Sequence, residues 1–474
     1  MVGITSIGAY IPIYRLNRDE IAGVWGGRSA GGMKAVAGYD EDTVTMAMAA
    51  VLDCLSRSGN AVDGLSLATT TAPYREKQSA AIIATAADLP AECHTADFTG
   101  SLRASAIAIK TAADAVKAGS AKNVIVAAAD SRQGAAKGMM EQTLGDGAAA
   151  LMIGSEGVIA EIEGSYSVFN DFTDVWRTED DTYLRTTEQR FIDEVGYIPT
   201  MQAAITGLME KYGHTAGNFT KIVYYASDVR QHAGLARRMK FDKAQVQPPL
   251  YDKIGNTGTA AALLMLIAAL EEAKAGDRIL FAGYGDGCDA FIFRVTDGIG
   301  SIAGKTALAA KLDGKISINY GLYLTWRNLV PLEASTLPER PLISLPSRWR
   351  ERRAIAALYG ARCRKCGTPQ ISQIGQKPRV CVHCQAKDDF EDYKFSDKKG
   401  KLFSYAIDQL QPTQNPPGVN GVIDYDGGGR IICELTDCEI DKVAVGMPVE
   451  MTYRKMFQSR GINNYFWKAK PAGE

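Results

Sequence analysis

Over its first three hundred residues the chain alternates short apolar runs with longer amphipathic or alanine-rich segments. Four of the apolar runs have the composition of strands: residues 4–11, 123–130, 221–227 and 278–285. Two of the longer segments have the apolar spacing of helices: residues 42–59 and 101–119. Such alternation is typical of an α/β fold in which helices cover a largely parallel sheet. We therefore expect a layered α/β architecture for this part of the chain.

One sequence pattern occurs twice in this region. It consists of a helix, a Lys-Ala-Gly stop, a strand, a Gly-Asp-Gly turn and a second strand, and it appears in residues 112–154 and again in 268–295. Such self-similarity predicts two related halves, 1–165 and 166–300, with the functional site where they meet. The alternative is a chance repetition of common turn signals.

The pattern changes after residue 295. Residues 301–345 mix proline, glycine and aromatic residues, which is typical of a linker, and the basic cluster 349–353 follows. This cluster either binds phosphate or forms a solvated helix face. The chain then shows short strands and turns without a long helical period. We expect a helix and a zinc ribbon over 346–390, followed by a small β domain over 391–474.

Four of the nine cysteines form two Cys-x-x-Cys pairs separated by fourteen residues: Cys363, Cys366, Cys381 and Cys384. Four thiolates at this spacing favour a tetrahedral Zn²⁺ site. A closed shell of four thiolates leaves no position for a substrate water, so the metal is expected to be structural. His383 is the alternative to Cys384 as fourth ligand. The other five cysteines lack a disulfide pattern and are expected to be reduced.

Size and charge narrow the possible partners. A chain of 474 residues predicts two or three compact units. Its 53 Lys and Arg nearly balance its 54 Asp and Glu, so no global field attracts nucleic acid or an anionic membrane. The N-terminal residues lack the features of an export signal, and the apolar block 260–270 is too short to span a bilayer. We expect a cytoplasmic protein that acts on a small metabolite.

The stretch ADFTGSLRASA, residues 96–106, combines a strand end, a glycine turn and a helix start. The backbone amides of Gly100 and Ser101 would face the positive end of the helix dipole, which suits an oxyanion or a phosphate. Ser101 is either a nucleophile or the N-cap of the helix.

Polar residues also follow two other predicted strands. Asn256, in IGNTGTAAA, either orients a thioester carbonyl or caps a helix. Tyr225, Asp228 and His232 lie in YYASDVRQH, beyond a strand end, where sheet proteins concentrate polar function. One of these three is a candidate acid or base, and the alternative is a surface or packing role.

The segment YGDGCDAF brings Tyr284, Asp286 and Cys288 into a glycine turn. The related turn GDGAAA contains Asp146, so both aspartates are expected to stabilise loops. Cys288 is expected to be inert, unless a cleft lowers the pKa of its thiol.

These motifs resemble those of a known superfamily. Residues 1 to about 300 resemble the 3-hydroxy-3-methylglutaryl-CoA synthases of the thiolase superfamily, through NDFTDVWR, YDKIGNTGTA, KAGDRILFAGYGDGCDAF and GDGAAALMIG. Residues from about 345 resemble the OB-fold, zinc-ribbon proteins that accompany thiolase-like enzymes, through RCRKCG, VCVHC, GKLFSYAI and GMPVEMTYR. The resemblance implies a duplicated thiolase-like α/β fold followed by a zinc ribbon and a β-barrel. It also implies an acyl-CoA substrate and a homodimer or higher homo-oligomer.

The catalytic positions depart from that resemblance. The synthases use a thiolate, a carboxylate and a histidine. The motifs place Gly100 at the position of the cysteine, Thr70 at or near that of the carboxylate, and Tyr225 or Ala226 at that of the histidine. Only Asn256 matches the family. These three differences argue against ordinary synthase chemistry.

Without a nucleophile, a CoA thioester can ionise at its α-carbon and join or release a carbonyl partner. The sequence therefore favours aldol or retro-aldol chemistry on a 3-hydroxyacyl-CoA, and it is similar in this to the thiolase-like aldolases of steroid side-chain breakdown, which also lack the thiol. Tyr225, Asp228 and Tyr284 are candidates for moving the hydroxyl proton. The amides of Gly100 and Ser101 would assist the enolate together with Asn256.

Two other functions remain open at this point. One is a Claisen-type acyltransferase in which Ser101, Cys93 or Cys288 carries the acyl group. The other is a non-catalytic subunit that binds CoA or a thiolase and channels intermediates. An OB fold also binds single-stranded nucleic acid in other proteins, but the balanced charge of this chain predicts no such binding.

Overall fold

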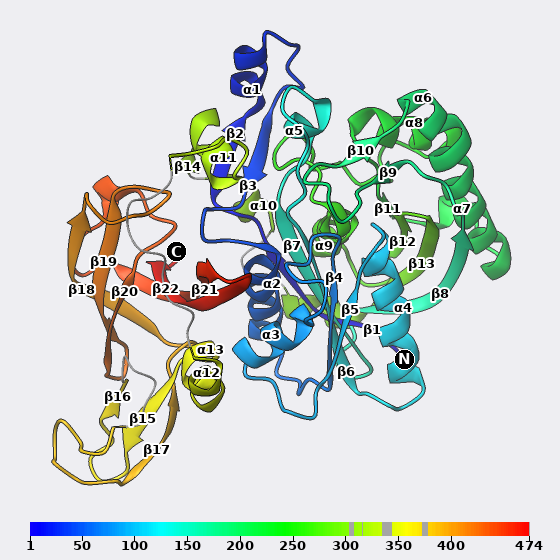
Figure 1. Ribbon diagram of the computed structural model, residues 1–474. Helices are drawn as coiled ribbons and strands as arrows, with labels where there is room; N and C mark the ends of the chain where they lie inside the picture. The colour runs from blue at the N-terminus through cyan, green and yellow to red at the C-terminus, as the bar shows by residue number, and fades with distance from the viewer. Residues whose placement is uncertain (303–307, 315, 334–343, 372–377, 474) are drawn as a thin grey trace. The chain divides into compact units, whose positions relative to one another are not determined.

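The computed structural model describes residues 1–302, 308–314, 316–333, 344–371 and 378–473 (Figure 1). It divides into two compact units. Unit 1 comprises Met1–Gly38, Asp42–Ala84 and Pro90–Tyr323, and unit 2 comprises Tyr39–Glu41, Thr85–Leu89 and Leu324–Glu474. The domain boundaries predicted at residues 165, 300, 345 and 390 stay predictions, and parts of the predicted linker and of the predicted ribbon segment lie outside the described residues.

A nine-stranded sheet forms the centre of unit 1, with the strand order β11-β12-β13-β8-β1-β7-β6-β4-β5. The four runs predicted as strands are confirmed as β1, β6, β11 and β12, and their buried side chains explain their apolar composition. The bounds of the nine strands are β1 Gly3–Tyr10, β4 Gly64–Ala68, β5 His94–Phe98, β6 Asn123–Asp130, β7 Gly147–Gly154, β8 Ala160–Phe169, β11 Lys221–Tyr224, β12 Arg278–Tyr284 and β13 Gly287–Val295.

The sheet is mixed, so the expectation of a largely parallel sheet is wrong. Strand β4 is parallel to β5 and β6, and β11 is parallel to β12, whereas all other neighbours in the sheet are antiparallel. The turn of residues 285–287 sends the chain directly from β12 back along β13, and the turn of residues 145–147 leads into β7. A tight turn can join only antiparallel strands, whereas parallel strands need a crossover connection.

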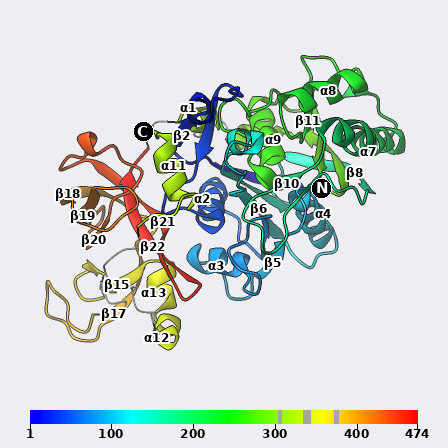
Figure 2. The same cartoon turned by 45° about the horizontal axis from the view of Figure 1, so that its top comes forward.

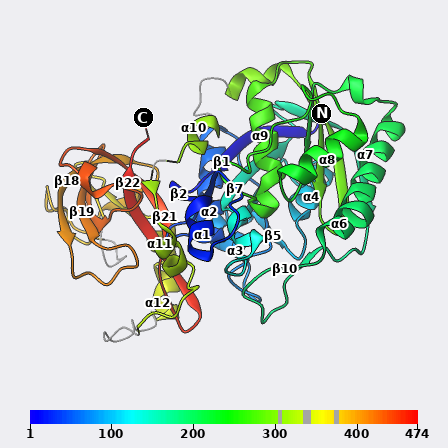
Figure 3. The same cartoon turned by 90° about the horizontal axis from the view of Figure 1, so that it is seen from above.

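Four helices place this sheet in a layered fold. Helix α2 (Thr43–Ser56) packs on β1, β6 and β7, and α7 (Ile198–Tyr212) packs on β8, β12 and β13, on the opposite side of the strands (Figure 1). Helices α4 (Ala104–Lys117) and α9 (Ala261–Glu272) each contact β7 and β12, which are distant in the sequence, and lie between α2 and α7 (Figure 3). A central position explains why nearly every side chain of α9 is buried.

Shorter elements complete unit 1. Strand β2 pairs with β3 and β14 in a small sheet, and β9 pairs with β10. Their bounds are β2 Tyr14–Asn17, β3 Met33–Val36, β14 Ile316–Ser317, β9 Val175–Trp176 and β10 Arg185–Thr186. The remaining helices are α1 Arg18–Trp25, α3 Ser79–Ala86, α5 Met139–Thr143, α6 Gln189–Phe191, α8 Val229–Met239, α10 Leu308–Leu312 and α11 Tyr320–Trp326. The loops between these elements carry most of the polar residues considered below.

Unit 2 contains a short helical segment, a three-stranded sheet and a five-stranded sheet (Figure 2). The first two consist of α12 Leu345–Arg350, α13 Arg352–Ala356, β15 Tyr359–Cys363, β16 Pro369–Gln370 and β17 Phe390–Lys394. The larger sheet has the order β20-β19-β18-β21-β22, with β18 Lys399–Asp408, β19 Gly418–Tyr425, β20 Arg430–Glu434, β21 Pro448–Ser459 and β22 Ile462–Pro471. A bridge between Leu435 and Ala469 joins the end of β20 to β22, as expected for a closed small barrel.

Within the described residues, no helix of either unit has the length and apolar character needed to cross a bilayer.

Candidate functional site

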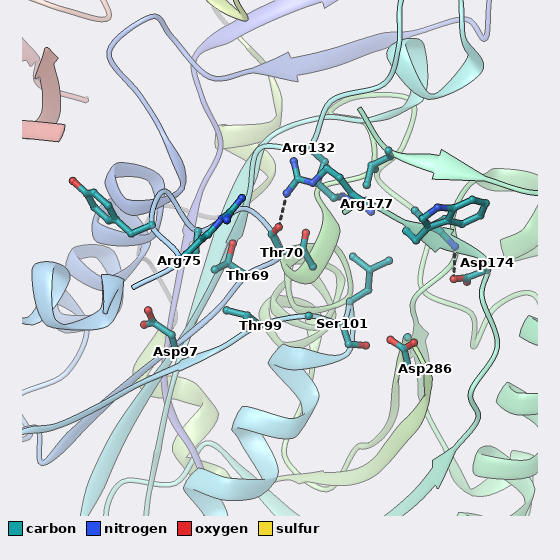
Figure 4. A pocket seen from close by; sticks show the side chains of 18 of the residues that line it. Thr69, Thr70, Arg75, Asp97, Thr99, Ser101, Arg132, Asp174, Arg177 and Asp286 are labelled. Atoms are coloured by element: carbon teal, nitrogen blue, oxygen red, sulfur yellow. Dashed lines mark hydrogen bonds between the residues drawn. The ribbon is translucent and has the colours of Figure 1, made fainter. Parts of the chain in front are cut away.

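A cavity of about 580 Å³ lies in unit 1, beside the start of α4 (Figure 4). Its wall is built from the segments that follow β4, β5, β6 and β8, together with the Gly-Asp-Gly turn between β12 and β13. The polar residues labelled in the view are Thr69, Thr70, Arg75, Asp97, Thr99, Ser101, Arg132, Asp174, Arg177 and Asp286. Such a concave site with converging polar groups is the expected form of a small-molecule site.

Gly100 and Ser101 line this cavity, as does Leu102. Gly100 has a left-handed backbone with φ of 83°, and helix α4 begins only at Ala104, with Arg103 as its N-cap. Ser101 is therefore not the N-cap, and that interpretation is wrong because the glycine turn delays the helix. The Arg103 side chain does not cap the helix either, and its Nη1 donates to the Val168 carbonyl at 2.9 Å. The start of α4 thus presents a positive dipole end to the cavity.

Asn256 connects two parts of the site. Its Oδ1 accepts from Arg132 Nη2 at 2.8 Å and from the Gly258 amide at 3.0 Å. Its Nδ2 donates to the Tyr225 hydroxyl and to the Ser227 carbonyl, both at 3.0 Å. Both amide hydrogens are used, so Asn256 fixes Arg132 and Tyr225 relative to each other. Its direct contact with a thioester carbonyl stays a prediction.

Asp174 and Tyr284 form a second pair at the cavity. Asp174 lines the cavity, and the hydroxyl of Tyr284, at the end of β12, hydrogen-bonds to its carboxyl group. Burial raises the pKa of Asp174 and also that of Tyr284. The Tyr284 ring lies parallel to that of Tyr225, with centroids 6.4 Å apart and planes 10° apart. A half-buried carboxyl group of raised pKa in a cavity is suited to proton transfer.

The sequence interpretation missed Asp174 and Arg132. Asp174 lies within NDFTDVWR, one of the motifs that carry the family resemblance. Arg132 follows the strand β6 by two residues and is 6% exposed. In the sequence each is only an isolated charge, Arg132 after a strand and Asp174 within a motif, and such a pattern does not reveal burial.

Asp228 and His232 have local roles in α8. Asp228 is the N-cap of this helix, and its Oδ1 accepts from the amides of Arg230 at 2.7 Å and Gln231 at 2.9 Å. His232 is buried and stacks on Tyr224, with ring centroids 4.4 Å apart, and burial lowers its pKa to about 4. Neither is among the described residues that line the cavity. A proton-transfer role for Asp228 stays a prediction.

The two turn aspartates differ from each other. Asp146 Oδ2 accepts from the Ala37 amide at 2.7 Å, which fixes a loop as expected. Asp286 lines the cavity with an exposed side chain, and its backbone has a positive φ of 47°. A left-handed aspartate at a cavity wall is a strained position of the kind found at functional sites.

The threonines after β4 surround a buried carboxylate. Asp130, which is fully buried, accepts at Oδ1 from the hydroxyl groups of Thr69, Thr70 and Thr71 and from the Thr70 amide, at 2.7 to 3.1 Å. Its Oδ2 accepts from the Thr259 amide at 2.8 Å. Thr70 is thus a wall residue whose hydroxyl already has a partner.

No cysteine lies in the described wall of the cavity. Cys288 is completely buried, and burial raises the pKa of its thiol. Cys93 is half-buried, and burial raises its pKa as well. A protonated, enclosed thiol is a poor nucleophile.

A candidate metal centre lies in unit 2. The Sγ atoms of Cys363, Cys366, Cys381 and Cys384 lie within 4.8 Å of one another. The separation is 3.6 Å between Cys363 and Cys384 and 3.5 Å between Cys366 and Cys381. A tetrahedral Zn²⁺ with bonds of about 2.3 Å requires sulfur atoms about 3.8 Å apart, so the cluster fits zinc. Cys384 belongs to the cluster and His383 does not.

Comparison with known proteins identifies relatives of the N-terminal two thirds of the chain. It is 34% identical over 336 residues to hydroxymethylglutaryl-CoA synthase of Methanopyrus kandleri, covering 68% of this chain and 96% of that protein. It is 35% identical over 348 residues to hydroxymethylglutaryl-CoA synthase of Caldivirga maquilingensis, covering 70% of this chain and 99% of that protein.

Solved structures and a family model agree with the fold. An HMG-CoA synthase complexed with CoA matches with a TM-score of 0.62 at 18% identity, over 68% of this chain and 89% of that one. MvaS in complex with 3-hydroxy-3-methylglutaryl coenzyme A matches with a TM-score of 0.63 at 20% identity, over 71% and 94%. The family model of the ChsH2 C-terminal OB-fold domain matches residues 393–454. The thiolase-like α/β fold and the OB fold are thereby confirmed.

Proposed function

The chain belongs to the hydroxymethylglutaryl-CoA synthase family, and on this premise we propose that it forms or cleaves a carbon–carbon bond of a 3-hydroxyacyl-CoA by aldol chemistry, without an acyl-enzyme. One observation carries the proposal. The cavity wall at the start of α4 consists of Gly100, Ser101 and Leu102, and no cysteine is among the described residues that line the cavity.

Ser101 lacks what a serine nucleophile requires. A serine hydroxyl is activated by a base within hydrogen-bond reach. The Ser101 Oγ is buried, and it has no hydrogen-bond partner among the described residues. This absence favours aldol chemistry over a Claisen-type acyltransfer in which Ser101 holds the acyl group. In this proposal the space beside the helix terminus holds the thioester itself.

The remaining groups support a balanced retro-aldol reaction. The ionised carboxylate of Asp174 takes the proton of the C3 hydroxyl, the C2–C3 bond breaks, and its electron pair passes to C2 of the thioester. The thioester oxygen then carries the enolate charge, which the backbone amides of Gly100 and Ser101 stabilise. Asp174 returns the proton to C2, so a shorter acyl-CoA and a carbonyl compound leave. Condensation follows the same steps in reverse.

Tyr284 and Tyr225 are buried behind the residues that line the cavity and position those residues for the reaction. Tyr284 hydrogen-bonds to Asp174, and Tyr225 is connected through Asn256 to Arg132. The side chains of Tyr284, Tyr225 and Asn256 are at most 5% exposed. They therefore hold in place the groups that face the cavity and do not contact bulk water. The exposed cations Arg75 and Lys77 line the cavity and suit the phosphates of CoA.

The predicted zinc ion has a structural role in this proposal. Four thiolates would complete its coordination, so no step of the reaction passes through it. A homodimer and a cytoplasmic location are part of the same proposal, and they rest on the family resemblance and on the sequence.

The test combines intact mass with product analysis. The full-length protein is mixed with acetyl-CoA and with a panel of 3-hydroxyacyl-CoAs, and protein mass and free products are measured in parallel. We expect no acyl adduct, and cleavage of a 3-hydroxyacyl-CoA to a carbonyl compound and a shorter thioester. An adduct mapped to Ser101, Cys93 or Cys288 would establish acyltransfer instead. Absence of both adduct and turnover across the panel would indicate a non-catalytic subunit.

The variant Ser101→Ala separates the first two outcomes. It removes the hydroxyl but keeps the backbone amide, so an aldolase keeps most of its turnover. An acyltransferase that uses Ser101 would lose turnover and adduct together. Thermal unfolding of the variant, compared with that of the unaltered protein, shows that the fold is intact.

A further inference from the structure

Arg132 is a buried cation that has no anionic partner among the residues the structure describes. Its side chain lines the cavity and is 6% exposed, and its Nε is buried without a hydrogen-bond partner among the described residues. Its contact at 2.8 Å is with the neutral Oδ1 of Asn256. Within the part of the chain that the structure describes, no carboxylate lies within 4.0 Å of its guanidinium group. Burying such a charge is costly unless a counter-ion joins it.

A second cation lies at the same end of the cavity. Arg177 also lines the cavity, and its Nη2 donates to the carbonyl oxygen of Thr70 at 2.8 Å. Figure 4 shows Arg132 and Arg177 together on one side of the cavity, with Ser101 and Asp286 on the other. Among the described residues, Arg177 has no ion-pair partner either. Two guanidinium groups with only neutral partners therefore face one end of the cavity.

Two acidic residues of the cavity, Asp97 and Asp174, are engaged elsewhere, and the third, Asp286, lies on the other side of the cavity from Arg132. Asp97 accepts from the amides of Ser79 at 2.7 Å and Ala80 at 2.8 Å, at the start of α3. Asp174 is bonded to Tyr284 and to the Val175 amide. The positive charge of Arg132 and Arg177 is thus left to be balanced by a bound molecule. A planar guanidinium matches a carboxylate in two parallel hydrogen bonds.

We infer that Arg132 holds a carboxylate of the substrate, so that the carbonyl partner of the aldol reaction is an oxo acid rather than an uncharged ketone or a second thioester. This inference rests on the proposed function for the reaction itself. With the thioester oxygen at the start of α4, the other end of a 3-hydroxyacyl chain extends across the cavity towards Arg132. The carboxylate stays on the carbonyl fragment when the C2–C3 bond breaks. Arg132 then determines which 3-hydroxyacyl-CoAs the site accepts.

The test uses CoA thioesters that differ in one carboxylate. The acidic probes are 3-carboxy-3-hydroxybutyryl-CoA and 3-hydroxy-3-methylglutaryl-CoA, which place the carboxylate at two distances from C3. The uncharged probe is 3-hydroxy-3-methylbutyryl-CoA. Binding of each to the full-length protein is measured by titration calorimetry, and cleavage is followed separately. The variants are Arg132→Gln, Arg132→Lys and, as a surface control, Arg190→Gln, whose exposed side chain pairs with Glu194.

We expect the protein to bind at least one acidic probe more tightly than the uncharged probe, by on the order of tenfold to a hundredfold. Arg132→Gln should abolish this preference and leave binding of the uncharged probe nearly unchanged. Arg132→Lys should keep part of the preference because it keeps the charge without the planar fork. Arg190→Gln should match the unaltered protein.

Other outcomes overturn the inference. Equal affinity of the unaltered protein for all three probes contradicts it, as does a preference that survives in Arg132→Gln. Equal weakening of acidic and uncharged probes in that variant would assign Arg132 to the thioester oxygen or to the positioning of Asn256. A preference that depends on Arg132, without cleavage of any probe, supports the inference and contradicts the proposed function. Lack of binding by any probe contradicts both.

Discussion

The Tyr284 hydroxyl hydrogen-bonds to the carboxyl group of Asp174 at the wall of the cavity. The two residues lie on segments far apart in the sequence, one at the end of β12 and the other just before β9. Burial raises the pKa of Asp174, while the bond from Tyr284 lowers it. The bond from Tyr284, like that from the Val175 amide, therefore limits how far burial raises the pKa of Asp174.

This relationship predicts the acidic limb of the pH profile of the enzyme. In the proposed reaction Asp174 acts in its ionised form, so kcat/KM should fall as the pH drops through its pKa, which burial raises above the usual value of about 3.9. Tyr284→Phe removes a bond that lowers this pKa, so the limb should move to higher pH and the rate should fall. Asp174→Asn should remove the limb and lower kcat/KM by about 10²-fold or more. The exposed Tyr405→Phe is the control, and a limb that does not move in Tyr284→Phe would contradict the prediction.

The cysteine cluster predicts one zinc ion per chain. Four thiolates at these separations bind Zn²⁺ tightly, and binding stabilises the segment that supplies them. Elemental analysis of the purified protein should find about one zinc per chain. Cys381→Ser should lose the metal and unfold at a lower temperature, as should the unaltered protein in the presence of a strong chelator. Cys438→Ser alters a thiol outside the cluster and should retain zinc. A folded, metal-free protein with unchanged melting would contradict the assignment.

The strands were predictable because burial dictates composition locally. A strand covered on both faces is apolar over nearly its whole length, as β6 and β12 are between their polar end residues, and the sequence alone shows this. The direction of pairing depends on which distant strand lies alongside, which no local pattern specifies. The mixed sheet was therefore missed, although the Gly-Asp-Gly turn before Cys288 contained the signal for a reversal of the chain.

The same limit applies to the site. Gly100 and Ser101 were found because a glycine before a helix start is a local signal. Arg132 and Asn256 are 124 residues apart, and their contact arises only when the two halves of unit 1 come together. Among the described residues no carboxylate lies beside the Arg132 guanidinium group, and this too is a property of the folded chain, since in the sequence Asp130 is two residues away.

We predict that adding a single carbon atom at Gly258 strongly lowers the stability of the protein. Its backbone has φ of 64°, and a Cβ at this position would lie 2.2 Å from Oδ2 of Asp130. Gly258→Ala should therefore cost about 2 kcal/mol or more of unfolding free energy and disturb the threonines that Asp130 holds. Gly234→Ala is the matched control, because its Cβ would meet no atom within 4 Å inside α8. That change should be neutral or stabilise by up to about 1 kcal/mol. Equal stability of the two variants in denaturant unfolding would contradict the prediction.

Because of the buried His232, we predict that the folded protein loses stability in mild acid. Its buried ring stacks on Tyr224, and burial lowers its pKa from 6.5 to about 4. Between pH 6.5 and pH 4 the His232 ring binds a proton in the unfolded chain but not in the folded chain. The contribution of the neutral ring to the free energy of unfolding is therefore complete above pH 6.5 and is lost as the pH falls towards 4. The loss should be on the order of 3 kcal/mol.

The measurement compares unfolding free energies from pH 7 to pH 4 in three proteins. His232→Gln should be less stable than the unaltered protein at neutral pH, and the difference should shrink as the pH falls. Leu235→Ala is a packing control from the same helix, with a fully buried side chain. It should lose about 2 to 5 kcal/mol at every pH, because its cavity does not titrate. A difference between His232→Gln and the unaltered protein that stays constant over this range would show that the histidine is not held neutral by its surroundings.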